Sequence, residues 1–142
     1  MTVLRLVGAL LLAVLVSGSA PTVTPTDEAA IAFHFSRFSP DRATVPAGVP
    51  IHITLNNDDP IAHEWIVGPA SIHEVHRKGT EAWHEGRPNE VSVPPYASRV
   101  TTVVFDQPGE FAFVCHLPGH EEYGMKGLVT VVSNSARVAR AS

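Results

Sequence analysis

Short stretches in which apolar and polar residues alternate recur along most of this chain, and they constrain its fold more than any other feature. Ile51, Ile53 and Leu55 are one example, and such a period of two is typical of a β-strand with one buried face. The others run from Ile31 to Phe35, Val91 to Val93, Val100 to Phe105, Phe111 to Phe113 and Leu128 to Val132. Pro and Gly residues that favour turns separate the stretches. The sequence therefore predicts an all-β fold, an antiparallel β-sandwich or a barrel.

One segment, from Pro69 to Pro88, does not alternate in this way. Ser71, with Glu74 three residues later, has the spacing of a helix capping box. At helical spacing the apolar side chains of the segment would share one arc, made of Ile72, Val75, Ala82 and Trp83. Gly79 weakens a helix by about 1 kcal/mol relative to alanine, so one broken helix or two short ones would fit. We expect a short helical excursion around residues 70–86.

The N-terminus has the layout of a secretory signal peptide. One basic residue, Arg5, precedes an unbroken apolar run from Leu6 to Val16 and the small residues Ser17 to Ala20. We therefore predict that residues 1–20 direct export to the periplasm or the extracellular space. The apolar run is short for crossing a bilayer, and an uncleaved leader that tethers the protein to a membrane is the alternative.

The rest of the chain is long enough for one domain with a hydrophobic core and too short for two. We expect a flexible tether at residues 21–29, a single domain at 30–133 and a disordered tail at 134–142. The whole chain has 14 acidic residues against 10 Lys and Arg residues, and it contains no basic run. This balance argues against binding to nucleic acid or to anionic membrane surfaces.

Cys115 is the only cysteine of the chain, so an exported form has no partner for an internal disulfide. His120 and Met125 follow it at the spacing Cys-x4-His-x4-Met. A thiolate, an imidazole and a thioether together suit a copper ion that cycles between its two oxidation states, provided that one more histidine comes from elsewhere in the fold. His63 is the best candidate. The sequence therefore predicts a copper site made by His63, Cys115, His120 and Met125.

Three other interpretations of Cys115 compete with copper ligation. It could be a buried thiol without a metal, beside histidines at the surface. Structural zinc sites favour more than one cysteine, and methionine is a poor zinc ligand. A thiol nucleophile with His120 as its base lacks an orienting third group and leaves Met125 unexplained. The joint spacing of three metal donors favours copper over each of these alternatives.

A longer pattern of residues surrounds the predicted ligands. Near Cys115 the pattern consists of Phe113, Pro118, Gly119, His120, Gly124, Met125 and Gly127. In the N-terminal half of the chain it consists of the segments Val45 to Pro50, Asn56 to Asp58 and His63 to Trp65. These residues resemble the cupredoxins, the blue copper proteins. The resemblance implies a Greek-key antiparallel β-sandwich with one type 1 copper ion near one end. His63, Cys115 and His120 would then be the strong trigonal ligands, and Met125 the weak axial ligand.

The resemblance also implies a function, that of a one-electron carrier between redox partner proteins rather than an enzyme. His120 would lie nearest the surface, and partners would dock on apolar residues around it, such as Leu117 and Pro118. We expect a monomer with no small-molecule substrate. The alternative is a periplasmic or extracellular copper-binding protein for copper tolerance or delivery, because the excursion at 69–88 looks like that of periplasmic cupredoxins associated with copper tolerance.

One position departs from the family pattern. Many cupredoxins carry an asparagine just after the first ligand histidine, where it helps to pin the cysteine loop. Glu64 stands at that place in this chain. The pinning hydrogen bond is therefore either absent or made by Asn57.

Three histidines of the excursion form a separate group. His73, His76 and His84 fall close together at helical spacing and could form a second, more labile copper or zinc site. A solvated helix face is the simpler interpretation and the one we favour, because three histidines on one arc need no metal to explain them.

The remaining histidines give weaker signals. His34 and His52 fall at polar positions of their strands and are expected at the surface. His116 follows Cys115 as in the His-Cys-His run of multicopper oxidases. Here Val114 precedes the cysteine, and one domain cannot supply the other ligands of a trinuclear cluster, so the sequence argues against such an enzyme.

Overall fold

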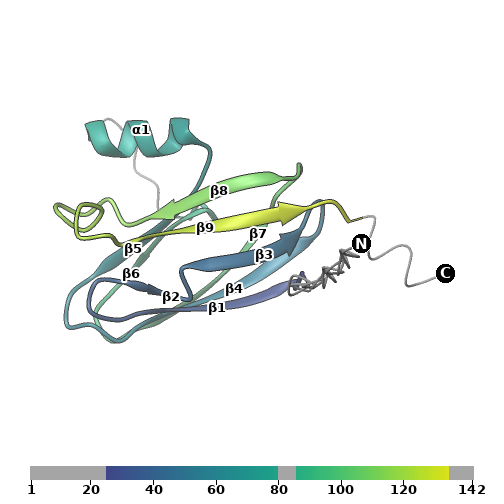
Figure 1. Cartoon of the computed structure of the whole chain (residues 1–142). Helices are drawn as coiled ribbons and strands as arrows, with labels where there is room; N and C mark the ends of the chain where they lie inside the picture. The colour runs from purple at the N-terminus through teal and green to yellow at the C-terminus, as the bar shows by residue number, and fades with distance from the viewer. Residues whose placement is uncertain (1–24, 80–85, 135–142) are drawn as a thin grey trace, which may run out of the picture.

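Two β-sheets packed face to face, with one helix beside them, make up the described part of the chain (Figure 1). The computed structural model describes residues 25–79 and 86–134. Its elements are β1 (Glu28–Phe33), β2 (Phe38–Ser39), β3 (Arg42–Pro46), β4 (Pro50–Asn57), β5 (His63–Gly68), α1 (Ala70–Lys78), β6 (Glu90–Val93), β7 (Ser98–Val104), β8 (Gly109–Val114) and β9 (Lys126–Val132). The predicted β-sandwich with a short helical excursion is therefore confirmed.

The two sheets are mixed, which differs from the antiparallel arrangement expected from the sequence. One sheet has the order β2-β1-β4-β7 and the other β3-β9-β8-β5-β6. Within them β1 pairs with β4, and β3 with β9, in parallel. Between β1 and β4 the chain crosses to the other sheet as β3 and then returns, so β4 runs in the same direction as β1. Such a crossover is the connection that parallel neighbours require.

The alternating residues pack into one core between the sheets. Phe33, Ile51, Leu55, Trp65 and Phe113 are all fully buried. Phe38 sits between Phe33 and Phe113 and meets each ring edge-on, with centroids 5.1 Å apart in both pairs, the geometry that aromatic rings prefer.

The alternation fails at Phe35, which is 80% exposed. Strand β1 ends at Phe33, and Phe35 and Ser36 both have φ of 52°. This left-handed turn rotates Phe35 out of the face that Ile31 and Phe33 share. His34 and His52 are exposed, as their polar positions predicted.

Helix α1 differs from the sequence prediction at its start and in its buried face. It begins at Ala70 after Pro69, with no side-chain capping hydrogen bond, so the predicted capping box of Ser71 and Glu74 is wrong. The helix buries its histidines, while Val75 is 39% exposed.

The end of α1 follows the prediction. Gly79 ends it in the left-handed conformation, with φ of 59°, which glycine adopts without steric cost.

Several predicted segments lie outside the described residues: the signal peptide at 1–20, residues 21–24 of the tether, His84 with Ala82 and Trp83, and residues 135–142 of the tail. Strand β1 starts at Glu28, two residues inside the segment expected to be a tether. Among the residues that the structure describes, no helix has the length and apolar character needed to cross a membrane.

We predict that Gly127→Ala destabilises the fold. Gly127 lies opposite Phe113 in the β8–β9 register, and an added Cβ would overlap the Phe113 ring and the Asp41 carbonyl oxygen. Overpacking of this kind costs about 1–3 kcal/mol, which urea unfolding of the metal-free protein would measure. Gly48→Ala is the control, because a Cβ there meets nothing within 4 Å and adds only backbone strain, about 1 kcal/mol. A Gly127→Ala protein as stable as the wild type would contradict this packing.

Candidate metal centre

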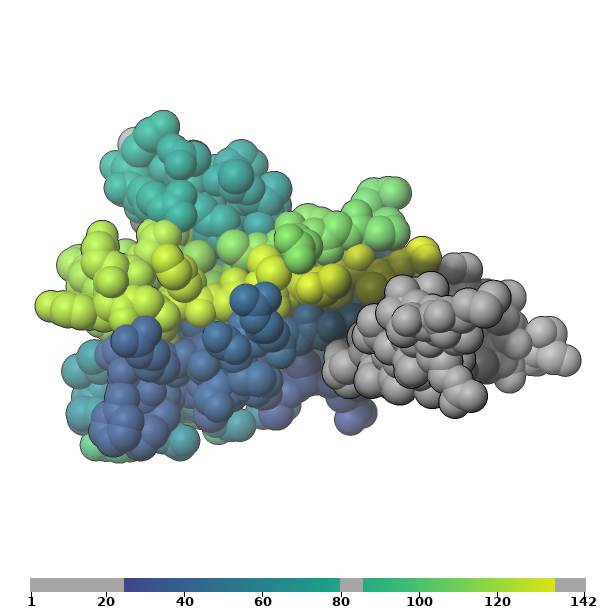
Figure 2. Space-filling view, viewed as in Figure 1, coloured from purple at the N-terminus to yellow at the C-terminus, as the bar shows by residue number. Residues whose placement is uncertain are grey.

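The loop between β8 and β9 supplies three of the four predicted ligands at one end of the sandwich (Figure 2). Its backbone closes on itself. Cys115 N–H donates to the Met125 carbonyl (3.1 Å), and Met125 N–H donates to the His120 carbonyl (2.9 Å). Gly119 and Gly124 make the turns, with φ of 83° and 92°, values that favour glycine. The positions of the three side chains therefore follow from the main chain of the loop.

The fourth predicted ligand, His63, is the first residue of β5 and faces the loop from the same sheet. Its Nδ1 lies 3.2 Å from Nδ1 of His120, and Cys115 Sγ lies 3.3 Å from that same atom. The three donor atoms all lie within 4.8 Å of one another. Ligands bound at 2.0–2.3 Å around a single ion are spaced about 3.3–4 Å apart. The arrangement is therefore already close to that of a three-coordinate metal site.

Met125 completes the donor set. Its side chain is fully buried and belongs to the same core cluster as Cys115. Two neutral imidazoles, one thiolate and a weak thioether are the ligands of a type 1 copper site, whereas closed zinc sites favour four strong donors. His63, Cys115, His120 and Met125 are thus positioned as a type 1 copper site.

Burial sets the protonation of the metal-free site. Loss of solvent raises the pKa of the Cys115 thiol to about 11, so the thiol keeps its proton at neutral pH until a metal replaces it. Burial also lowers the pKa of His120, and His63 beside it lowers that pKa further. The His120 ring is therefore neutral and can offer a lone pair.

The hydrogen bond to the cysteine sulfur comes from the backbone rather than from an asparagine side chain. Glu64 N–H donates to Cys115 Sγ at 3.3 Å, so the identity of residue 64 does not decide whether this bond forms. One alternative from the sequence was that Asn57 pins the cysteine loop, and this alternative is wrong. Its Nδ2 instead donates to the carbonyls of Ile61, Val93 and Pro94, and it fixes the loop that leads into His63.

Asp59 is a site residue that the sequence reasoning missed. It is 5% exposed, and its Oδ2 accepts a hydrogen bond from His63 Nε2 at 2.8 Å. Burial would raise the pKa of its carboxyl group, but hydrogen bonds from the backbone of Ser36 and Phe35 outweigh that effect and hold the pKa below its usual value. An acidic residue four positions before the candidate ligand was the only signal in the sequence.

The histidines of α1 are buried, so the predicted solvated helix face is wrong. His73 Nδ1 lies 2.9 Å from His116 Nε2, and the ring of His76 stacks on that of His116. Loss of solvent lowers the pKa of His116 to about 4. Within 25–79 and 86–134, only the set of His63, Cys115 and His120 brings three such donor atoms together. The predicted second site also used His84, which is outside these ranges.

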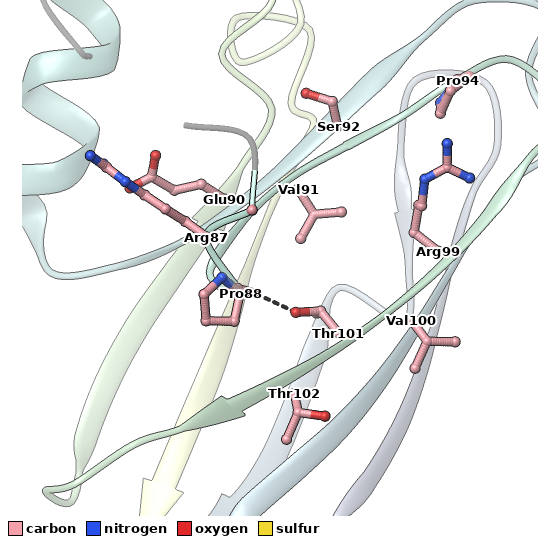
Figure 3. A pocket seen from close by; sticks show the side chains of 11 residues that line it. Arg87, Pro88, Glu90, Val91, Ser92, Pro94, Arg99, Val100, Thr101 and Thr102 are labelled. Atoms are coloured by element: carbon pink, nitrogen blue, oxygen red, sulfur yellow. Dashed lines mark hydrogen bonds and ion pairs between the residues drawn. The ribbon is translucent and has the colours of Figure 1, made fainter. Parts of the chain in front are cut away.

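A surface groove between β6 and β7 has a volume of about 600 Å³ (Figure 3). It is lined by residues that include Arg87, Val91, Arg99 and Thr101, and the Thr101 hydroxyl donates to the Pro88 carbonyl across it at 2.7 Å. Among the residues that the structure describes, no residue of the copper loop (residues 115–125) and no histidine, cysteine or methionine lines this groove. The groove therefore plays no part in the metal centre.

Comparison with solved structures supports the fold. Auracyanin from Roseiflexus castenholzii superposes with a TM-score of 0.64 at 23% identity, covering 77% of this chain and 99% of that one. Auracyanin A from Chloroflexus aurantiacus, a "blue" copper protein, gives 0.57 at 19% identity, covering 77% of this chain and all of that one.

Sequence comparison identifies curated relatives and a family. The copper-resistant cuproprotein CopI of Rubrivivax gelatinosus is 33% identical over 98 residues, 67% of this chain and 59% of that protein. Its counterpart from Pseudomonas aeruginosa is 28% identical over 126 residues, covering 66% of this chain and 70% of the relative. The model of the cupredoxin-like domain matches residues 6–131. The chain therefore belongs to the cupredoxin-like family, and its cofactor is copper.

Proposed function

We propose that this protein holds one type 1 copper ion and passes single electrons between redox partner proteins. The observation that carries this proposal is the convergence of three donor atoms within 4.8 Å at a buried site. Bound copper supplies the one-electron redox chemistry. A donor set that is already in place needs little rearrangement when the charge of the metal changes, which favours fast electron transfer.

The roles of the ligands follow from their burial and chemistry. Cys115, once its proton is lost, would hold the metal through its thiolate, and His63 and His120 would bind it through their Nδ1 atoms. Met125 would be the weak fourth donor, which tunes the reduction potential. His63 and Cys115 are fully buried, whereas His120 is only partly so. This difference supports His120 as the point where electrons enter and leave.

The surface at this end of the sandwich supports docking of partner proteins. Tyr123 is 72% exposed and lies in the copper loop, close to Gly119. Pro118 is exposed, and Leu117 is partly buried against the core. Aromatic and apolar side chains of this kind are enriched at protein interfaces. Docking near His120, a monomeric state and the lack of enzymatic activity belong to this proposal.

Copper tolerance is the second candidate function. Both curated relatives are named copper-resistant cuproproteins, which favours this role as much as the site favours electron transfer. In this role the protein would protect the cell by holding copper, and redox cycling would be secondary. Export to the periplasm or the extracellular space is part of both candidates, and the signal-peptide pattern at 1–20 supports it.

We predict that Cys115→Ser removes the strong visible absorption of the Cu(II)-loaded protein, because that absorption requires a thiolate bound to Cu(II). The variant should keep its far-ultraviolet circular dichroism. His52→Ala, a change at an exposed histidine, should leave the absorption intact. A wild-type protein that stays colourless with one equivalent of Cu(II) under non-reducing conditions would refute the type 1 site.

We predict that Met125→Leu keeps the copper and raises the reduction potential, because loss of a weak donor disfavours Cu(II) more than Cu(I). Protein-film voltammetry and metal analysis of the same sample measure the two properties. Loss of copper from this variant would show that Met125 is a primary ligand instead.

The same variant separates the two candidate functions. A strain that lacks this gene would be complemented with wild type, with Met125→Leu and with Cys115→Ser, and its growth in copper would be measured. If binding alone confers tolerance, Met125→Leu should restore growth fully, whereas Cys115→Ser should not. Normal copper tolerance in the deletion strain would contradict the tolerance role and leave electron transfer.

We predict that the variant His73→Ala, His76→Ala and His84→Ala binds the same single copper equivalent as the wild type in calorimetry at neutral pH. His73 already uses both of its ring nitrogens in hydrogen bonds, and His76 uses its Nδ1. Loss of His73 leaves Nε2 of the buried His116 ring without its partner, so stability should fall by about 1–3 kcal/mol. Two equivalents in the wild type and one in the variant would instead establish a second metal site.

A further inference from the structure

We propose that Asp59 is a positioning residue of the metal centre, which selects the tautomer of His63 and lowers the reduction potential through its buried negative charge. This inference rests on the proposed copper site. It concerns a residue that is not a ligand and that contacts the site only through the far side of the His63 ring.

The hydrogen bond between Asp59 and His63 fixes the position of the ring proton. Asp59 Oδ2 lies 2.8 Å from His63 Nε2, and an ionised carboxylate can only accept. Nε2 must therefore carry the proton. Nδ1 is left with its lone pair, and Nδ1 is the atom that lies 3.2 Å from His120 Nδ1 at the metal position. The carboxylate thus selects the tautomer that can bind a metal.

A strained turn holds this carboxylate in place. Phe35 N–H donates to Oδ1 at 2.7 Å and Ser36 N–H donates to Oδ2 at 2.8 Å. Both residues have φ of 52°, a conformation that costs non-glycine residues of order 1–3 kcal/mol and persists only where the surroundings enforce it. Successive N–H groups of this kind form a concave site that binds anions. The strain of the turn is therefore explained by the anion that it binds.

The charge should act on the copper as well as on the ring. Asp59 is 5% exposed and His63 is fully buried, so solvent screens their interaction little. A carboxylate that accepts the proton of a ligand imidazole makes that ligand more basic. A more basic ligand favours the more highly charged Cu(II) over Cu(I), and the reduction potential falls.

Asp59→Asn tests the charge, with Asp58→Asn as its matched control. The amide introduced by Asp59→Asn would keep an oxygen that can accept from His63 Nε2 and Ser36 N–H, but would lose the charge and the hydrogen bond from Phe35 N–H. Asp58 is its exposed neighbour, so the control removes the same charge at a solvated position. We expect Asp59→Asn to change the ratio of Cu(II) to Cu(I) affinity by on the order of tenfold, about 59 mV upward in potential. We expect the control to shift it far less, and equal potentials in the two variants would overturn the proposed role of the charge.

A measurement on the metal-free wild-type protein tests the proposed tautomer of His63 and needs no variant. Nitrogen-15 NMR of its histidine side chains at neutral pH should show His63 with a protonated Nε2 and a bare Nδ1. The opposite tautomer would overturn the proposal, even if Asp59→Asn failed to fold. This measurement needs no copper. If the protein showed the expected tautomer but did not form a blue copper site, the proposed function would be refuted, while the choice of tautomer by Asp59 would still be supported.

Discussion

The antiparallel pairing of β8 with β9 is the constraint on which the rest of the site depends. It runs from Gly109 opposite Val131 to Val114 opposite Lys126, and one further hydrogen bond joins Cys115 to Met125. The first and last ligands of the loop are therefore held side by side by main-chain bonds. Any slip in this register by one residue would turn every side chain of β9 to the other face of the sheet, and the core and the metal centre would be lost together.

Buried polar groups at this end of the molecule are satisfied in two separate chains of contacts. One passes from the backbone of Phe35 and Ser36 through Asp59 to His63. The other passes from the carbonyl of Ala112 through His73 to His116. The first series of contacts ends at the ligand His63, and the second ends at His116, which follows the ligand Cys115 in the sequence. Because unsatisfied polar groups are costly in such surroundings, these contacts restrict the positions that the ligands can adopt.

The sequence predicted those features that depend on residue type and spacing. Alternation located β1, β4, β6, β7, β8 and β9 but not β2, β3 or β5. The rarity of cysteine, with His120 and Met125 behind it, located the metal loop. The sequence did not predict the role of Asp59, because the residues that hold its carboxylate lie 23 and 24 positions away from it. Nor did it predict that α1 buries His73 and His76 while Val75 is exposed, since the partner that accounts for this burial, His116, lies on a distant loop.

The contacts between α1 and the copper loop have a consequence for how this protein could be rebuilt. Arg77 donates two hydrogen bonds, of 2.7 and 2.9 Å, to Glu121 of the loop, and His73 contacts His116 on the same loop. Helix and loop therefore form one unit, although they are far apart in the chain. A transplant of residues 115–125 into a smaller cupredoxin would leave His116 without His73 and Glu121 without Arg77. The transferable module is the loop together with α1.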